Sequence, residues 1–83
     1  MWKILIDKPA MKFLLKQPKF QQERILRALN QLPEIGDIKP MSGYENLYRV
    51  RIGNYRALYT INSGILIVNV LTIGNRGDVY KSF

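Results

Sequence analysis

The chain has 83 residues, 47% of them hydrophobic, and a formal net charge of +7, and it contains neither cysteine nor histidine. This length and composition predict a single domain, residues 1–83, and the excess of Lys and Arg points to a polyanionic partner, most often nucleic acid or an acidic protein. Without cysteine and histidine the chain has no disulfide, no thiolate and no imidazole, so we expect no metal and no cofactor. Because we find neither a signal peptide nor an apolar run of about 20 residues, we expect a cytoplasmic location and no membrane contact.

The first half of the chain predicts one strand, two helices and a loop. Trp2–Ile6 is a short apolar run and is predicted to be a strand. Asp7–Pro9 then starts a helix, because proline is favoured in the first turn and an acidic side chain suits the helix N-terminus. A second helix is expected from about Lys19 to Leu32, where apolar residues recur at spacings of four and three. Residues 33–43, rich in Pro and Gly, are expected to form a loop that carries Lys39.

The second half predicts three strands joined by tight turns. Leu47–Ile52 alternates between two faces, and Gly53-Asn54 forms a two-residue hairpin turn to a strand over Tyr55–Ile61. Ile65–Leu71 is nearly continuous in Ile, Val and Leu, which is typical of a strand covered on both faces, and Thr72–Asp78 is expected to leave the sheet as a loop. The predicted order is β-α-α-β-β-β, an α+β fold in which a helical hairpin packs on one face of an antiparallel sheet.

Arginines of the second half are the candidate functional residues: Arg49, Arg51, Arg56 and Arg76. Arg49 and Arg51 are two apart on a strand and share a face. A tight hairpin can bring Arg56 near Arg51, and the register of the two strands decides whether both lie on that face. Only Glu45 and Asp78 are acidic in residues 44–83, so this cluster is under-neutralised and predicts an external anion. The alternative is that the arginines are solvated side chains on an open sheet.

Aromatic rings offer stacking surfaces for bases. We expect Tyr55 and Tyr80 at the surface. Phe13, Phe20 and Tyr59 are expected in the core.

Three stretches of the chain form a pattern: Lys39–Gly43, then Leu47–Tyr59, then Ile73–Tyr80. They are similar to the "K-L-x-G, then Y-R/K-I/V-R/K" signature and the "V-G-x-R…V-Y" ending of the RelE branch of the RelE/ParE toxin superfamily. The strand and helical hairpin of residues 2–32 match in order as well, so the resemblance covers nearly the whole chain.

The resemblance implies the toxin of a type II toxin–antitoxin system. Such a toxin is a ribosome-dependent endoribonuclease that cuts mRNA in the ribosomal A site and so inhibits translation, and its partner is a cognate antitoxin with which it forms a hetero-oligomer. The implied catalytic residues are Arg49, Arg51, Arg56, Arg76 and Tyr80. The expected substrate-binding residues are Lys39, Arg49, Arg51 and Tyr55.

RNA cleavage without a metal uses the ribose 2′-OH as nucleophile on the adjacent phosphate. The resemblance puts Arg56 at the arginine that stabilises the transition state, Arg76 at a second catalytic arginine and Tyr80 at the C-terminal active-site tyrosine. Arg49 and Arg51 fall at two basic strand positions where the family often has lysine. Arginine stays protonated in proteins, so neither is suited to act as general base.

Two alternatives stay open. One is a ParE-like gyrase inhibitor, which shares the fold but lacks the catalytic arginines and tyrosine. The other is a catalytically inactive module of the same fold that binds RNA or a partner protein.

Overall fold

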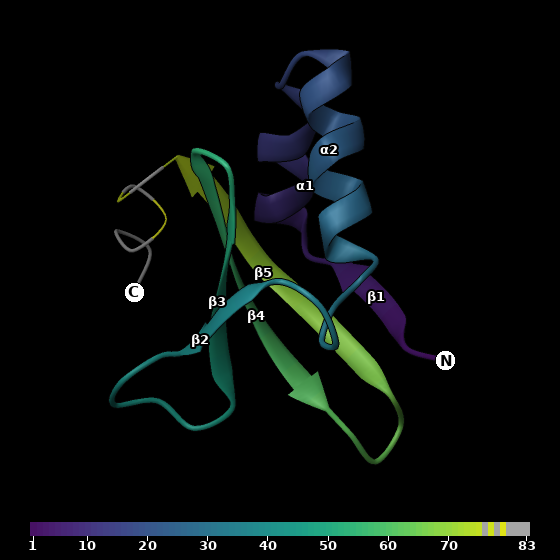
Figure 1. Cartoon of the computed structure of the whole chain (residues 1–83), viewed down its shortest axis with the longest axis vertical. Helices are drawn as coiled ribbons and strands as arrows, with labels where there is room; N and C mark the ends of the chain where they lie inside the picture. The colour runs from purple at the N-terminus through teal and green to yellow at the C-terminus, as the bar shows by residue number, and fades with distance from the viewer. Residues whose placement is uncertain (76, 78, 80–83) are drawn as a thin grey trace.

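The described part of the chain, residues 1–75, 77 and 79, contains a strand, two helices and four further strands. In chain order they are β1 (Lys3–Ile6), α1 (Lys8–Leu15), α2 (Lys19–Leu29), β2 (Asp37–Pro40), β3 (Leu47–Ile52), β4 (Tyr55–Asn62) and β5 (Ile67–Asn75). Figure 1 shows this computed structural model, with the two helices side by side. Neither helix is long and apolar enough to cross a membrane, within the residues described.

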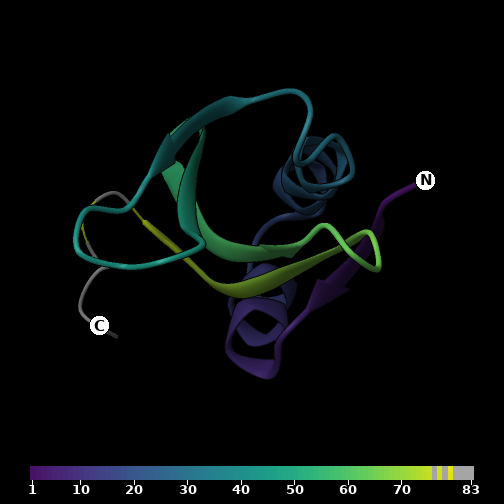
Figure 2. The ribbon, with the colours of Figure 1, turned by 90° about the horizontal axis from the view of Figure 1, so that it is seen from below.

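The strands of the described residues form one mixed sheet in the order β1-β5-β4-β3-β2. The β3–β4–β5 meander is antiparallel, as the turns predicted, whereas β1 pairs with β5 in parallel. Parallel neighbours need a long connection, and the helices and the meander supply it here. The sheet is strongly curved (Figure 2). The two helices pack on one of its faces.

Two parts of the sheet differ from the sequence-based expectation. Residues 33–43 are not all loop, because β2 lies within them and pairs antiparallel with β3. A proline ends this strand, and an edge strand tolerates proline because one side of it has no neighbour to accept an N–H. The last strand also extends to Asn75 instead of ending at Leu71, because residues 72–74 pair with residues 56–58 of β4.

The main core lies between the helices and one sheet face. Ala10 and Leu14 of α1 and Ile25 and Leu29 of α2 are all buried, each pair at the i, i+4 spacing that puts two side chains on one helix face. They pack on inward-facing strand residues, which include Val50, Ile52, Ala57, Tyr59, Val68 and Val70. The α+β class, with a helical hairpin on one face of the sheet, is therefore confirmed.

A smaller apolar cluster lies on the face opposite the helices. Leu47, Leu58 and Val79 are its buried members. Val79 packs closely on Gly74, where a Cβ atom would lie only 3.1 Å from the Val79 backbone nitrogen. Val79 thus lies on the helix-free face, against the end of β5.

Candidate functional site

Four basic side chains lie on the sheet face that the helices leave open. Lys39 is directly opposite Arg49 across the β2–β3 pair, and Arg51 is directly opposite Arg56 across the β3–β4 pair. Side chains of directly opposed residues in an antiparallel pair project to the same side of the sheet. We call these four residues, Lys39, Arg49, Arg51 and Arg56, the basic face.

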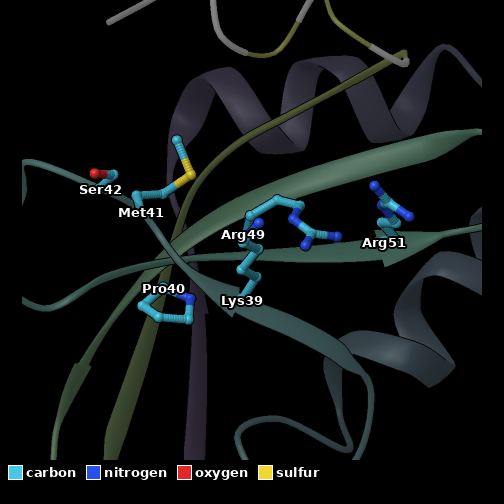
Figure 3. A pocket seen from close by; sticks show the side chains of 6 residues that line it. All are labelled: Lys39, Pro40, Met41, Ser42, Arg49 and Arg51. Carbon is cyan, nitrogen blue, oxygen red and sulfur yellow. The ribbon is translucent and has the colours of Figure 1, made fainter.

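The basic face borders an open pocket of about 270 Å³. Its lining residues are Lys39, Pro40, Met41, Ser42, Arg49 and Arg51. Figure 3 shows Lys39 and Arg49 next to each other, with Arg51 further along the same strand. A hydroxyl and three cations around one hollow make a site suited to the oxygens of a phosphate.

Arg49 is the most buried member of the basic face, with 6% of its surface exposed. Its Nη1 atom lies 3.8 Å from Oδ1 of Asp37, the only ion pair among the described residues. Arg51 is exposed and Arg56 is half-buried, and neither has a carboxylate partner in that same part of the chain. Among the described residues, only Asp37 offsets the charge of the basic face, so that this part of the chain leaves the cations under-neutralised.

The loop that carries Ser42 is tied to the sheet at both ends. The Met41 backbone N–H donates to the Leu47 carbonyl oxygen at 2.8 Å. At the other end, the Asn46 side-chain amide donates to the Ile61 carbonyl oxygen and its Oδ1 accepts from the Ile61 N–H. Asn46 has φ +57°, a left-handed conformation that asparagine tolerates better than most residues. These contacts hold one wall of the pocket in place.

The prediction that Tyr55 is a surface ring that binds substrate is wrong. Tyr55 is 8% exposed, its hydroxyl donates to Oε1 of Gln17 at 3.2 Å, and its ring packs edge-on against Phe13. The two-residue turn explains this, because the register that sets Arg56 opposite Arg51 also sets Tyr55 opposite Ile52, whose side chain faces the helices.

Of the three aromatic residues expected in the core, one is fully buried, one is partly buried and one is exposed. Tyr59 is fully buried in the main core, as expected, and Phe13 is partly buried beside it. Phe20, expected in the core, is 67% exposed near the start of α2. Arg76 and Tyr80 lie outside the described residues.

Sequence reasoning missed two residues of this site, Asp37 and Ser42. Asp37 is two residues before Lys39, so strand alternation would have placed both on one face had residues 37–40 been recognised as a strand. Ser42 carried no signal of its own, since it lies in a loop.

The described residues contain no group of three or more His, Cys, Asp or Glu side chains that could hold a metal ion. The basic face can bind and polarise a phosphodiester, since guanidinium groups match phosphate oxygens in shape and charge.

Comparisons with known proteins agree with this architecture. A family model described as "ParE toxin of type II toxin-antitoxin system, parDE" matches residues 4–80. Toxin RelE3 of Methanocaldococcus jannaschii is 32% identical in an alignment 88 residues long, which covers 98% of each chain.

Two solved structures extend the comparison to the fold. The toxin–antitoxin complex RelE–RelB from Pyrococcus horikoshii OT3 contains a chain that matches with a TM-score of 0.76 at 27% identity, covering 93% of this chain and 97% of that one. The isolated Escherichia coli RelE toxin shares the fold, with a TM-score of 0.74 at 21% identity, over 99% of this chain and 94% of that one. Sequence and fold together show that the chain belongs to the RelE/ParE family of type II toxins and is a RelE-type toxin.

Proposed function

We propose that this toxin is a metal-independent endoribonuclease that cuts mRNA in the ribosomal A site and so stops translation. The observation that carries the proposal is the direct opposition of Arg51 and Arg56, beside Lys39 and Arg49, on the open sheet face. Like charges set directly opposite each other destabilise a sheet, so the arrangement is best explained by an anion that binds between them.

In the proposed reaction the ribose 2′-OH attacks the adjacent phosphorus and the bond to the 5′-oxygen breaks. The products are a 2′,3′-cyclic phosphate and a free 5′-hydroxyl. Arg56 stabilises the charge of the phosphorane, and Arg49, Arg51 and Lys39 hold phosphate oxygens.

Proton transfer is assigned to two residues on the family resemblance alone. Arg76 would stabilise or protonate the leaving 5′-oxygen, and Tyr80 would orient or deprotonate the 2′-OH. Neither residue is among those described.

A cognate antitoxin is proposed as the partner in a hetero-oligomer. Relatives from Pyrococcus horikoshii and Methanococcus jannaschii were solved as RelE–RelB antitoxin–toxin complexes. An uncontrolled translation inhibitor would arrest its own host, and an acidic segment of an antitoxin would complement the basic face.

Replacement of Arg56 by alanine tests the proposal. Removal of one preorganised donor at a developing charge lowers a rate by about 100- to 1000-fold, so Arg56→Ala is expected to lose cleavage of ribosome-bound mRNA while keeping its melting temperature. Cleavage is measured by primer extension on purified translating ribosomes. Arg27→Ala is the matched control, because Arg27 is an exposed arginine of α2, away from the basic face. Wild-type cleavage by Arg56→Ala would contradict the assignment.

The match to the ParE family model keeps gyrase inhibition as a second candidate. Induction in cells separates the two, since a ribonuclease stops amino-acid incorporation first and a gyrase inhibitor stops DNA synthesis first. A catalytically inactive binding module would stop neither amino-acid incorporation nor DNA synthesis. The observation that favours this alternative is arginine at both residues 49 and 51, since arginine is unsuited to act as general base.

A further inference from the structure

The Arg49 guanidinium is a buried cation with incomplete bonding. Its side chain is 8% exposed, and its Nη1 atom has no hydrogen-bond partner among the described residues. The contact to Asp37 is 3.8 Å long, which exceeds hydrogen-bond distance. Buried charges in proteins are normally both paired and hydrogen-bonded, because losing water is costly. Arg49 therefore keeps donor capacity that the described residues do not use.

Asp37 is far more exposed than Arg49, the buried arginine with which it pairs. Its side chain is 61% exposed, and it lies at the start of the edge strand β2. The strand register sets it opposite Arg51 and two residues from Lys39, so it lies among three cations of the basic face. An exposed carboxylate beside Arg49, a lining residue of the pocket, is free to turn into solvent when a stronger ligand arrives.

Resting on the proposed function, we propose that Asp37 is an internal counter-ion that occupies Arg49 in the free toxin and is displaced by an RNA phosphate. A phosphate can form short, paired hydrogen bonds to a guanidinium, which the 3.8 Å contact to Asp37 does not provide. In the free protein, Asp37 reduces the repulsion among the cations of the basic face. The exchange also makes Asp37 a positioning residue that lowers the affinity for RNA.

The test compares Asp37→Asn with Glu34→Gln. Both changes remove one negative charge, but Glu34 is an exposed residue before β2 with no ion pair among the described residues. The ligand is a fluorescein-labelled 2′-O-methyl RNA oligonucleotide, which lacks the attacking hydroxyl and cannot be cut. Binding is measured by fluorescence anisotropy over a range of salt concentrations.

Asp37→Asn is expected to tighten binding about fivefold, because an exposed carboxylate no longer competes for Arg49. Glu34→Gln is expected to change the affinity by less than about twofold. Because Arg49 contacts a phosphate in both complexes, the slope of log affinity against log salt, about 0.7 per phosphate contact to a single strand, should be the same in Asp37→Asn as in the wild type. In an Arg49→Ala background, Asp37→Asn should bring no gain.

Three results would overturn the inference: equal effects of Asp37→Asn and Glu34→Gln, a salt slope steeper by about one phosphate contact in Asp37→Asn, or the same gain without Arg49. Weaker binding by Asp37→Asn would show instead that Asp37 orients Arg49 for the substrate. The proposed nuclease activity is tested separately, and it fails if mRNA on the ribosome stays uncut. Absence of oligonucleotide binding in both the wild type and Asp37→Asn would overturn this inference, whereas the proposed activity is decided by cleavage on ribosomes.

Discussion

At the scale of single residues, the described part of the chain offsets the repulsion within the basic face only in part. Arg51 and Arg56 oppose each other directly, and the one ion pair of the described residues joins Asp37 to Arg49 at 3.8 Å. Strand alternation made the shared face of Arg49 and Arg51 predictable from local pattern, whereas the position of Arg56 opposite Arg51 depended on the register of the hairpin.

A second residue with an unmet polar group is Tyr59, in the main core. Its hydroxyl is buried with no hydrogen-bond partner among the described residues, and its ring stacks on Tyr48 with centroids 5.6 Å apart. Burial, and to a smaller extent the neighbouring Tyr48, raises the pKa of Tyr59 from 10.0 to about 12. The charged phenolate is therefore disfavoured in the folded state.

This shift predicts a loss of stability in alkali. Between pH 10 and about 12 the unfolded chain releases the Tyr59 proton while the folded chain keeps it. The free energy of unfolding then falls as pH rises, by at most about 1.4 kcal/mol per pH unit. Urea unfolding at pH 9 and pH 11 should show a smaller loss in Tyr59→Phe than in the wild type. The same variant should be equally or more stable at pH 7, because it removes an unpaired buried hydroxyl. Equal alkaline losses in both proteins would contradict the role of Tyr59.

At the scale of elements, the end of β5 provides the surface on which Val79 packs. Gly74 pairs with Arg56, and Val79 lies against it, 2% exposed, in the cluster with Leu47 and Leu58. The absence of a side chain at residue 74 is what allows this approach. The proposed catalytic Tyr80 follows Val79 directly in the sequence.

Gly74→Ala is expected to impair cleavage more than folding. The new Cβ would lie 3.1 to 3.2 Å from backbone atoms of Val79, so Val79 must shift while the helix-covered core stays intact. We expect a cost of about 1–3 kcal/mol, typical of overpacking, and a cleavage rate on ribosomes reduced by at least about tenfold. Gly64→Ala is the control, because a Cβ there meets only the Asn62 side chain, at 3.4 Å. Wild-type cleavage by a folded Gly74→Ala protein would refute this role for Gly74.

At the scale of the whole molecule, a chain of 83 residues without histidine has few groups that can move a proton. The basic face can stabilise charge, but its arginines cannot serve as general base. For the proposed reaction we therefore expect the ribosome and the substrate to supply much of the geometry for attack by the 2′-OH.

Cleavage of free mRNA by the purified toxin is accordingly expected to be negligible beside cleavage of the same mRNA on ribosomes. Single-turnover rates on both substrates, at equal toxin concentration, give the comparison. The Arg56→Ala protein measures the background in each. Comparable rates on free and ribosome-bound mRNA would mean that the chain carries a complete set of catalytic groups.

The sequence by itself determined what depends on near neighbours along the chain: both helices, the three meander strands, the hairpin turn and the shared face of Arg49 and Arg51. These follow from periodicity and turn chemistry, which act over a few residues. Only the tertiary structure decided the parallel pairing of β1 with β5, the strand β2, and the contacts of Asp37 with Arg49 and of Val79 with Gly74. Each of these joins segments that no local pattern links, so its formation depends on how the whole sheet closes over the core.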